Sequence, residues 1–346
     1  MEEPLSTVAS VSTRDCATCG RPAMHGDHPT PLCSDCREKF TRLQIPVWIW
    51  IFAGGIAVIL LFSLFTLPKS ISLGVHLEKG KKALEEKKFS TAEKEFTKVL
   101  EKAPSNVAAR GDLLISAFYN QDYELFDAQY KKLVGVNIED KSLYSEIDKV
   151  MTKAEAYRSS DSFDVFKKSY SDEALIPDTA WDRYLRQHTE DRYAEQEYGF
   201  LLYNKKDYRR CDSLVEEALQ SDYEYIPALM LGVNSKRDEG DLDGAMAYVD
   251  RMLAINHESV WALSAKSRTF LRQKKMKPGL DLALKLYDMD KQSAYALSTL
   301  ILAYHFNGRT GDRDALIKKA RSSPMDSTGK IYLQYALDVI DNKEKF

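Results

Sequence analysis

The feature that most constrains the fold is a sequence pattern that recurs with a fixed period of about 34 residues in the long C-terminal part of the chain. Tyr123 follows Phe89 by one such period, and each stands just before an amphipathic run. A second series with the same period consists of Tyr208, Leu242, Met276 and Thr310. A period of roughly 20 to 50 residues is typical of stacked supersecondary units. We therefore expect an all-α superhelical solenoid in this part of the chain.

These units resemble the tetratricopeptide repeat (TPR) family, whose unit is two antiparallel helices with small residues at their close crossing. The first unit, residues 73–106, places Gly80, Ala92, Phe96 and Pro104 at the family's glycine, alanine, aromatic and closing proline positions. The resemblance covers roughly two hundred residues. It implies αα-hairpins stacked into a superhelix, whose concave surface binds a protein or peptide partner.

Composition and pattern divide the chain into segments of different character. Residues 141–191 depart from the period, and Pro177 interrupts them. Apolar residues near helical spacing after residue 328 are typical of a helix that caps an exposed repeat. The expected segments are a disordered lead (1–13), a zinc-ribbon-like module (14–45), a transmembrane helix (46–68), TPR block 1 (69–140), a degenerate repeat and joint (141–191), TPR block 2 (192–327) and a capping helix (328–346).

Four of the five cysteines form two CxxC pairs near the N-terminus. Cys16 and Cys19 form the first pair, Cys33 and Cys36 form the second, and Gly20 follows the first pair. This spacing predicts one tetrahedral four-cysteine metal site. We expect zinc, because four thiolates are a usual structural shell for it. Iron in a rubredoxin-like site is the alternative.

Two histidines, His25 and His28, lie between the cysteine pairs and are competing candidate ligands. We interpret them as loop residues, because four cysteines already complete a tetrahedral shell. Residues 14–40 resemble the short zinc-ribbon modules at the N-termini of many bacterial membrane proteins. That resemblance implies a small metal-stabilised fold and little about function. The fifth cysteine, Cys211, is expected to be a buried small apolar residue.

An uncharged apolar stretch, residues 47–67, lies between Pro46 and Pro68. As a helix it would be about 31 Å long, close to the thickness of a bilayer hydrocarbon core. Trp48 and Trp50 stand at its start, where indole rings favour a membrane interface. We therefore expect a single-pass membrane protein with membrane lipid as a partner. The alternative is a buried helix of a soluble domain.

The charges beside this stretch do not orient it, because similar numbers of basic residues flank both ends. Free thiolates persist most easily in a reducing cytosol. This favours a cytoplasmic location for residues 1–45 and a non-cytoplasmic location for the repeats.

Charge and motifs exclude several classes of function. The net charge is −3 and neither half of the chain is basic, so nucleic acid is not expected as a partner. The sequence has no Ser-His-Asp arrangement, phosphate loop or HExxH motif. We therefore expect neither enzymatic activity nor a small-molecule substrate.

The geometry of the family implies which residues would face inward in the second block. They are Tyr193, Phe200, Tyr203, Asn234, Arg237, Arg268, Arg272 and His305. Asn234 and the three arginines could hold an acidic side chain or a C-terminal carboxylate, because guanidinium binds carboxylate as a bidentate fork. The alternative is an ordinary solvated helix face.

Together these patterns favour a membrane-anchored scaffold, in which the repeats bind a partner near the membrane and a structural zinc module lies on the other side. The alternative function is an iron-binding or redox-sensing protein. In that case the CxxC pairs are the working site and the repeats are its output module.

Overall fold

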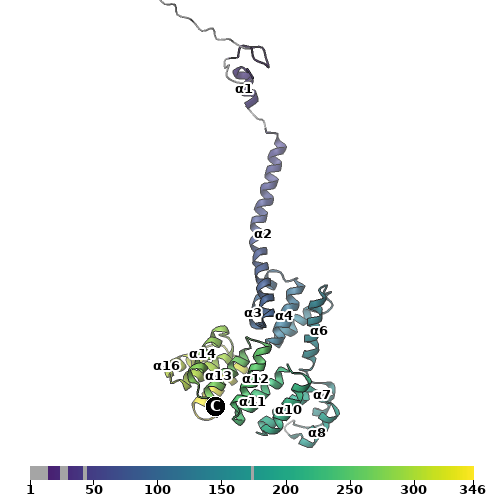
Figure 1. The fold of residues 1–346 in the computed structure, drawn as a ribbon, viewed down its shortest axis with the longest axis vertical. Helices are drawn as coiled ribbons and strands as arrows, with labels where there is room; N and C mark the ends of the chain where they lie inside the picture. Colours follow the sequence, from purple (N-terminus) through teal and green to yellow (C-terminus); the bar gives the residue numbers. More distant parts are fainter. Residues whose placement is uncertain (1–14, 24–29, 42–44, 173–174) are drawn as a thin grey trace, which may run out of the picture. The chain divides into compact units, whose positions relative to one another are not determined.

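The computed structural model describes residues 15–23, 30–41, 45–172 and 175–346, with the side chains of all of these except residues 62–70. The chain divides into two compact units, Met1–Ser70 and Ile71–Phe346. Figure 1 shows the helices in chain order. In the described ranges all regular secondary-structure elements are helices. Outside them, an isolated antiparallel bridge joins Asp15 to Pro22. The predicted all-α class is confirmed.

The first unit contains α1 (Ser34–Thr41) and the beginning of α2 (Val47–Glu85). We expected an apolar helix that stops at Pro68, but α2 continues through this residue. Proline removes a backbone donor and weakens a helix without always ending it. The continuation of α2 is strongly charged, and its Gly80 and Ala83 pack against Phe96 of the next helix, so it supplies the first helix of the repeats.

The predicted single-pass membrane localisation is contradicted. Among the helices of the described residues, none combines the length and the apolar character that crossing a bilayer requires. The apolar stretch that suggested a span is one end of a longer helix whose other end is charged. The predicted orientation is contradicted together with the localisation, and membrane lipid as a partner is not supported.

The second unit continues with short helices joined by tight turns (Figure 1). The first group is α3 (Phe89–Lys102), α4 (Val107–Tyr119), α5 (Tyr123–Leu133), α6 (Lys141–Glu155), α7 (Asp161–Lys168) and α8 (Asp178–Gln187). The second group is α9 (Arg192–Asn204), α10 (Tyr208–Ser221), α11 (Ile226–Glu239), α12 (Leu242–Ile255), α13 (Val260–Arg272), α14 (Met276–Met289), α15 (Ala294–Phe306), α16 (Thr310–Ser322) and α17 (Ser327–Ile340).

Helix packing follows the order of the repeats. In the second block α9 packs against α10, α11 against α12, α13 against α14, and α15 against α16. The first helices of successive pairs also contact one another, from α9 through α11 and α13 to α15 and then α17. Each unit thus packs mainly against its neighbours, which is the arrangement of a helical-repeat solenoid. The fold implied by the sequence period is confirmed.

The backbone shows the same period at the turn inside each helix pair. A residue with positive φ occupies this turn at Lys87, Gln121, Lys206, Gly240, Lys274 and Gly308. Within each series, successive members of this set are one period apart. Only two of the six are glycines, although an L-residue with a side chain is disfavoured there.

Close helix crossings explain Gly80, which the family resemblance singled out, and Gly199 of α9. A Cβ on Gly80 would lie 2.7 Å from Cε1 of Phe96 in the next helix. A Cβ on Gly199 would lie 2.7 Å from Cδ2 of Leu231. A side chain at either position would displace the facing ring or leucine, so glycine suits these close crossings.

The buried core of the second unit consists of four clusters that follow one another along the chain. The segment between the two repeat series holds α6, α7 and α8, and the Trp181 ring of α8 stacks on Tyr198 of α9 at 5.0 Å. A contact distant in sequence links Thr91 to Glu258, whose carboxylate accepts from the Thr91 backbone N–H at 2.8 Å. The division of the chain into two blocks and a joint stays a prediction.

Candidate functional site

The four cysteines of the two CxxC pairs meet at one point. Their Sγ atoms all lie within 4.8 Å of one another. The first pair lies on a turn in which Gly20, with φ +73°, donates to the carbonyl of Cys16 at 2.9 Å. The second pair lies at the start of α1, where the Cys33 carbonyl accepts from the Arg37 N–H at 2.9 Å. A tetrahedral zinc with Zn–S of about 2.3 Å separates its sulfurs by about 3.8 Å, so the cluster fits this shell.

The electrostatics of the thiols also suit a cation. Backbone donors at Cys33 and Thr18 lower the pKa of Cys16 to about 6. Hydrogen bonding to Cys19 and Cys33 raises the pKa of Cys36 to about 12. Thiols this close cannot all ionise unless a positive charge stands among them. Four sulfur donors are the set that zinc or an iron centre prefers.

The two histidines weighed as competing ligands, His25 and His28, lie outside the described residues. The assignment of the cysteines as metal ligands depends on the sulfur geometry and on the chemistry of the four thiols. Zinc as the bound metal stays a prediction.

Three of the predicted partner-binding residues, one each from α9, α11 and α13, converge on the Asp238 carboxylate, which sequence reasoning missed. Arg272 donates from Nη1 to Oδ1 of Asp238 at 2.8 Å. Arg237 approaches the same oxygen with Nε at 3.5 Å and donates from Nη2 to Oδ1 of Asn234 at 3.0 Å. Tyr203 donates its hydroxyl to Oδ2 of Asp238. We call these five residues the Asp238 cluster.

The third arginine of the predicted set, Arg268, is only 5% exposed. Its Nε donates to the Thr299 hydroxyl at 2.9 Å, and its Nη2 donates to the Ser298 hydroxyl at 2.8 Å. The guanidinium lies 4.4 Å from the ring centroid of Tyr295 and 5.5 Å from that of Tyr335. Both partners that bond it are neutral, so its positive charge is not compensated by a bonded carboxylate.

The other three predicted residues do not join this network directly. Phe200 is 52% exposed and contacts the Tyr203 ring at 6.2 Å, so it extends the Asp238 cluster along α9. Tyr193, at the start of α9, packs edge-on against Phe163 instead. His305 of α15 contacts the Arg313 guanidinium through Nδ1, and burial together with this arginine lowers the pKa of His305. His305 is therefore neutral near pH 7.

Register within the repeats could have revealed Asp238. Arg272 stands one period after Asp238, at the equivalent position of the next unit, and Arg237 stands one period after Tyr203. Equivalent positions on neighbouring first helices lie side by side in a solenoid. A search for opposite charges at this spacing would have paired Asp238 with Arg272.

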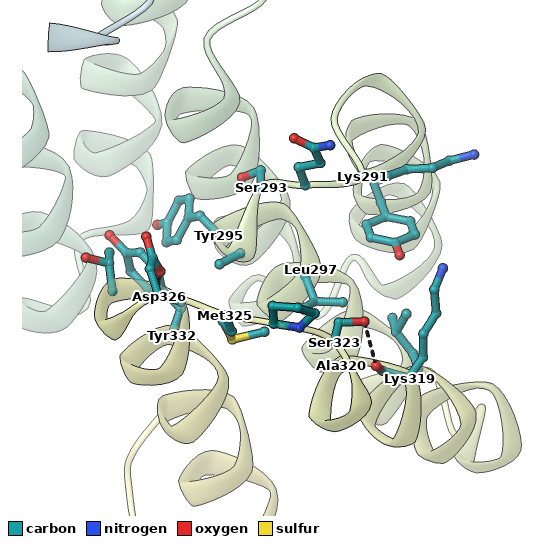
Figure 2. A pocket seen from close by; sticks show the side chains of 17 residues that line it. Lys291, Ser293, Tyr295, Leu297, Lys319, Ala320, Ser323, Met325, Asp326 and Tyr332 are labelled. Atoms are coloured by element: carbon teal, nitrogen blue, oxygen red, sulfur yellow. Dashed lines mark hydrogen bonds between the residues drawn. The ribbon is translucent and has the colours of Figure 1, made fainter. Parts of the chain in front are cut away.

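A cavity of about 690 Å³ lies beside the buried arginine, and sequence analysis did not predict it. Figure 2 shows Tyr295 and Leu297 of α15, Lys319 of α16 and Tyr332 of α17 around it. The Tyr295 and Tyr332 rings are 4.8 Å apart. Because Tyr295 also packs on Arg268, the cavity and this guanidinium share one aromatic wall.

No protein-family model matches the chain. No curated protein matches it either. Solved structures do match it, at low identity. A tetratricopeptide repeat protein from Parabacteroides merdae is 12% identical, with a TM-score of 0.39, over 77% of this chain and 99% of that one.

Yeast Tom70 is 14% identical, with a TM-score of 0.38, over 73% of this chain and 60% of that one. The TPR domain of P58(IPK) is 15% identical, with a TM-score of 0.23, over 79% and 99%. All three TM-scores are below 0.5, so these likenesses carry no argument about function. The solenoid itself resembles TPR proteins, as its sequence period and helix pairing show.

Proposed function

We propose that this chain is a helical-repeat scaffold that binds an acidic segment of a protein partner on the face formed by α9, α11, α13 and α15. The observation that carries the proposal is the excess of arginine on this face. Arg237 and Arg272 share the Asp238 carboxylate, and Arg268 is bonded only to hydroxyl groups. Guanidinium groups recognise carboxylates in a bidentate geometry.

Burial strengthens this attraction. The side chains of Arg237 and Arg272 are 12% and 13% exposed, so solvent screens their charges less than it screens surface charges. Nη1 of Arg237 is buried and has no hydrogen-bond acceptor. An unsatisfied donor of this kind costs about 1–3 kcal/mol, and a partner carboxylate that reached it would remove the cost. Exposed Phe200 adds an apolar contact beside the charges.

Fluorescence anisotropy with the full chain tests the proposal. The probes are a labelled peptide of alternating Glu and Ser, and a matched peptide of alternating Lys and Ser. We expect binding of the acidic peptide only, because the face carries excess positive charge. Arg272→Gln should weaken that binding by about tenfold, the effect of one lost charge-assisted hydrogen bond. The matched control is Arg321→Gln on exposed α16, which should change nothing.

A variant that should increase the affinity for the acidic peptide makes the test more specific. Asp238→Asn removes the carboxylate that competes for Arg237 and Arg272. The acidic peptide should then bind several-fold more tightly, whereas a purely structural role for these arginines predicts no gain. Equal affinity for both peptides, or unchanged affinity in both variants, would show that this face does not select acidic segments.

We propose further that Cys16, Cys19, Cys33 and Cys36 hold one structural zinc ion. Four thiolates would complete its shell and leave no position for substrate, so its role would be to fix the fold of residues 15–41. The support is the convergence of the sulfur atoms within 4.8 Å.

Metal analysis of the purified full chain tests this assignment. Elemental analysis should find one zinc per chain in the parent protein and none in Cys36→Ser. Cys211→Ala is the matched control, because Cys211 is buried in the solenoid and should not affect the metal. A visible charge-transfer band with reversible reduction would instead support iron and the redox-sensing alternative.

A further inference from the structure

A second cavity, of about 210 Å³, is lined by residues from α4, α5, α6, α9 and α11 and from the turn after α6. Its aromatic lining consists of Phe118, Tyr123, Phe126, Tyr157 and Tyr193. Tyr123 is 41% exposed, so the cavity opens to solvent beside it. Five aromatic rings around one small opening form a surface suited to a flat apolar group.

The rings are held in place by their own contacts. Tyr157 packs at 5.3 Å against Phe118 and edge-on at 6.3 Å against Tyr123. The Tyr157 hydroxyl accepts from the Ile226 N–H at 3.2 Å. This bond anchors the ring to α11, so the shape of the cavity is largely set before anything enters it.

One edge of the cavity is polar. Arg158 lies there and donates from Nη2 to Oδ1 of Asp127 at 2.8 Å. A guanidinium has five N–H donors, so this single bond leaves capacity for another acceptor. Gln196 lies on the same lining, and its Oε1 accepts from the Tyr225 hydroxyl at 3.1 Å, which leaves its amide N–H groups as donors.

We propose that this cavity receives an aromatic side chain from a protein partner, with an acidic residue beside that side chain placed against Arg158. This goes beyond the acidic-segment function, because the cavity shares no residue with the Asp238 cluster. It also gives a role to Tyr193, which the sequence placed on the partner-binding face.

Size and chemistry together select this occupant. An apolar cavity of about 150 Å³ accepts benzene, so a 210 Å³ space accommodates a phenyl or phenol ring. Surrounding aromatic rings favour an entering ring in edge-to-face contact, which an aliphatic side chain cannot make. The charge of Arg158 at the mouth favours a neighbouring carboxylate and disfavours a neighbouring lysine.

Ligand-detected NMR with the full chain provides the test. The probes are N-acetyl-Phe-Glu-amide, N-acetyl-Ala-Glu-amide and N-acetyl-Phe-Lys-amide at millimolar concentration. We expect Phe-Glu to bind about tenfold more tightly than Ala-Glu, the effect of burying one ring. We expect it to bind several-fold more tightly than Phe-Lys, because only Phe-Glu complements Arg158.

Two variants, one in the aromatic lining of the cavity and one at its polar edge, test the aromatic contact and the charge contact separately. Tyr123→Ala should weaken Phe-Glu binding by about tenfold, and the matched control Tyr144→Ala, at a 58% exposed tyrosine of α6 outside the cavity, should not. Arg158→Gln should keep the preference for Phe over Ala and lose the preference for Glu over Lys. This second variant alters an exposed side chain, so it keeps the test valid if Tyr123→Ala misfolds.

The proposal fails if Phe-Glu does not bind, or if Tyr123→Ala and Tyr144→Ala bind it equally. It also fails if Arg272→Gln, rather than Arg158→Gln, abolishes the preference for Glu, because the probe would then occupy the Asp238 cluster. Failure at the cavity leaves the acidic-peptide result on the other face unaffected, so the two proposals are tested separately.

Discussion

The cysteine module and the helical solenoid are stabilised in opposite ways. In the described part of residues 15–41, the buried apolar side chains are Cys16, Ala23 and Cys33, and two of these are proposed metal ligands. The solenoid instead buries four successive clusters that extend from Ala83 to Val339. A segment with so little apolar core depends on its ligands for a fixed structure, whereas a solenoid sums many local contributions.

The contrast predicts different responses to damage. Loss of one ligand should abolish the whole module, because the remaining three sulfurs do not complete a shell. Loss of one core side chain should weaken one stretch of the solenoid and leave distant repeats intact. The following predictions test that difference, beginning with the largest expected effect.

Removal of one thiolate should unfold the module completely. In Cys36→Ser, or after chelation of the parent protein, amide protons of residues 15–23 and 30–41 should exchange at the rate of an unstructured chain. The solenoid should keep its helical circular dichroism and its melting temperature. Hydrogen exchange read by mass spectrometry reports both units in one experiment. A shared loss of protection would show that the two units are not energetically independent.

Truncation of a core aromatic residue should damage the solenoid locally. Phe96 is fully buried and lies over Gly80, so Phe96→Ala should cost about 3–5 kcal/mol. Protection from exchange should fall first in α3 and α4 and persist in α13 to α15. The control is Tyr144→Ala on an exposed site, with an effect below about 0.5 kcal/mol. Uniform loss of protection across all repeats would mean that the solenoid melts as one unit.

The sequence predicted the solenoid well because its signal is repeated. The units of the two repeat series share one period, so a unit whose own pattern is weak is placed by its neighbours. The course of the helix through Pro68 was harder to predict, because the apolar stretch occurs once and no neighbouring unit repeats its pattern. The sequence does not show that the same helix continues into the charged first repeat.

Site residues were harder to predict, because their partners come from other units. The cysteines were found from local spacing, and their convergence needed no distant contact. Arg237 and Arg272 were placed on the inner face, but Asp238 between them was missed. The aromatic cavity joins α5 to α11, and no local pattern reveals a contact between such distant segments.

A buried carboxyl group should make the solenoid sensitive to pH. Glu195 is 5% exposed, and its Oε2 is buried without a partner. Burial, together with the charge of Glu217, raises the pKa of Glu195 from an ordinary 4.5 to about 7. The folded state therefore holds this proton more tightly than the unfolded state, and stability is lost as pH rises from about 4.5 to about 7. The penalty is complete above that range.

The substitution Glu195→Gln tests this penalty. It should raise the free energy of unfolding at pH 8 by about 1–3 kcal/mol, because one pKa unit corresponds to about 1.4 kcal/mol. Near pH 4 the variant and the parent should be equally stable. Urea denaturation at both values measures the difference. An equal gain in the free energy of unfolding at both pH values would assign the effect to packing rather than to ionisation.

The smallest expected effect concerns the turns that set the period. Lys274 has φ +61° at the position where the preceding repeat has Gly240, with φ +105°. A side chain is disfavoured in this conformation, so Lys274→Gly should stabilise the solenoid by up to about 1 kcal/mol. Lys285→Gly, at an exposed site inside α14, should destabilise it by about 1 kcal/mol. Urea denaturation of both variants measures this contrast, and destabilisation by both would mean that Lys274 contributes more through its side chain than its backbone conformation costs.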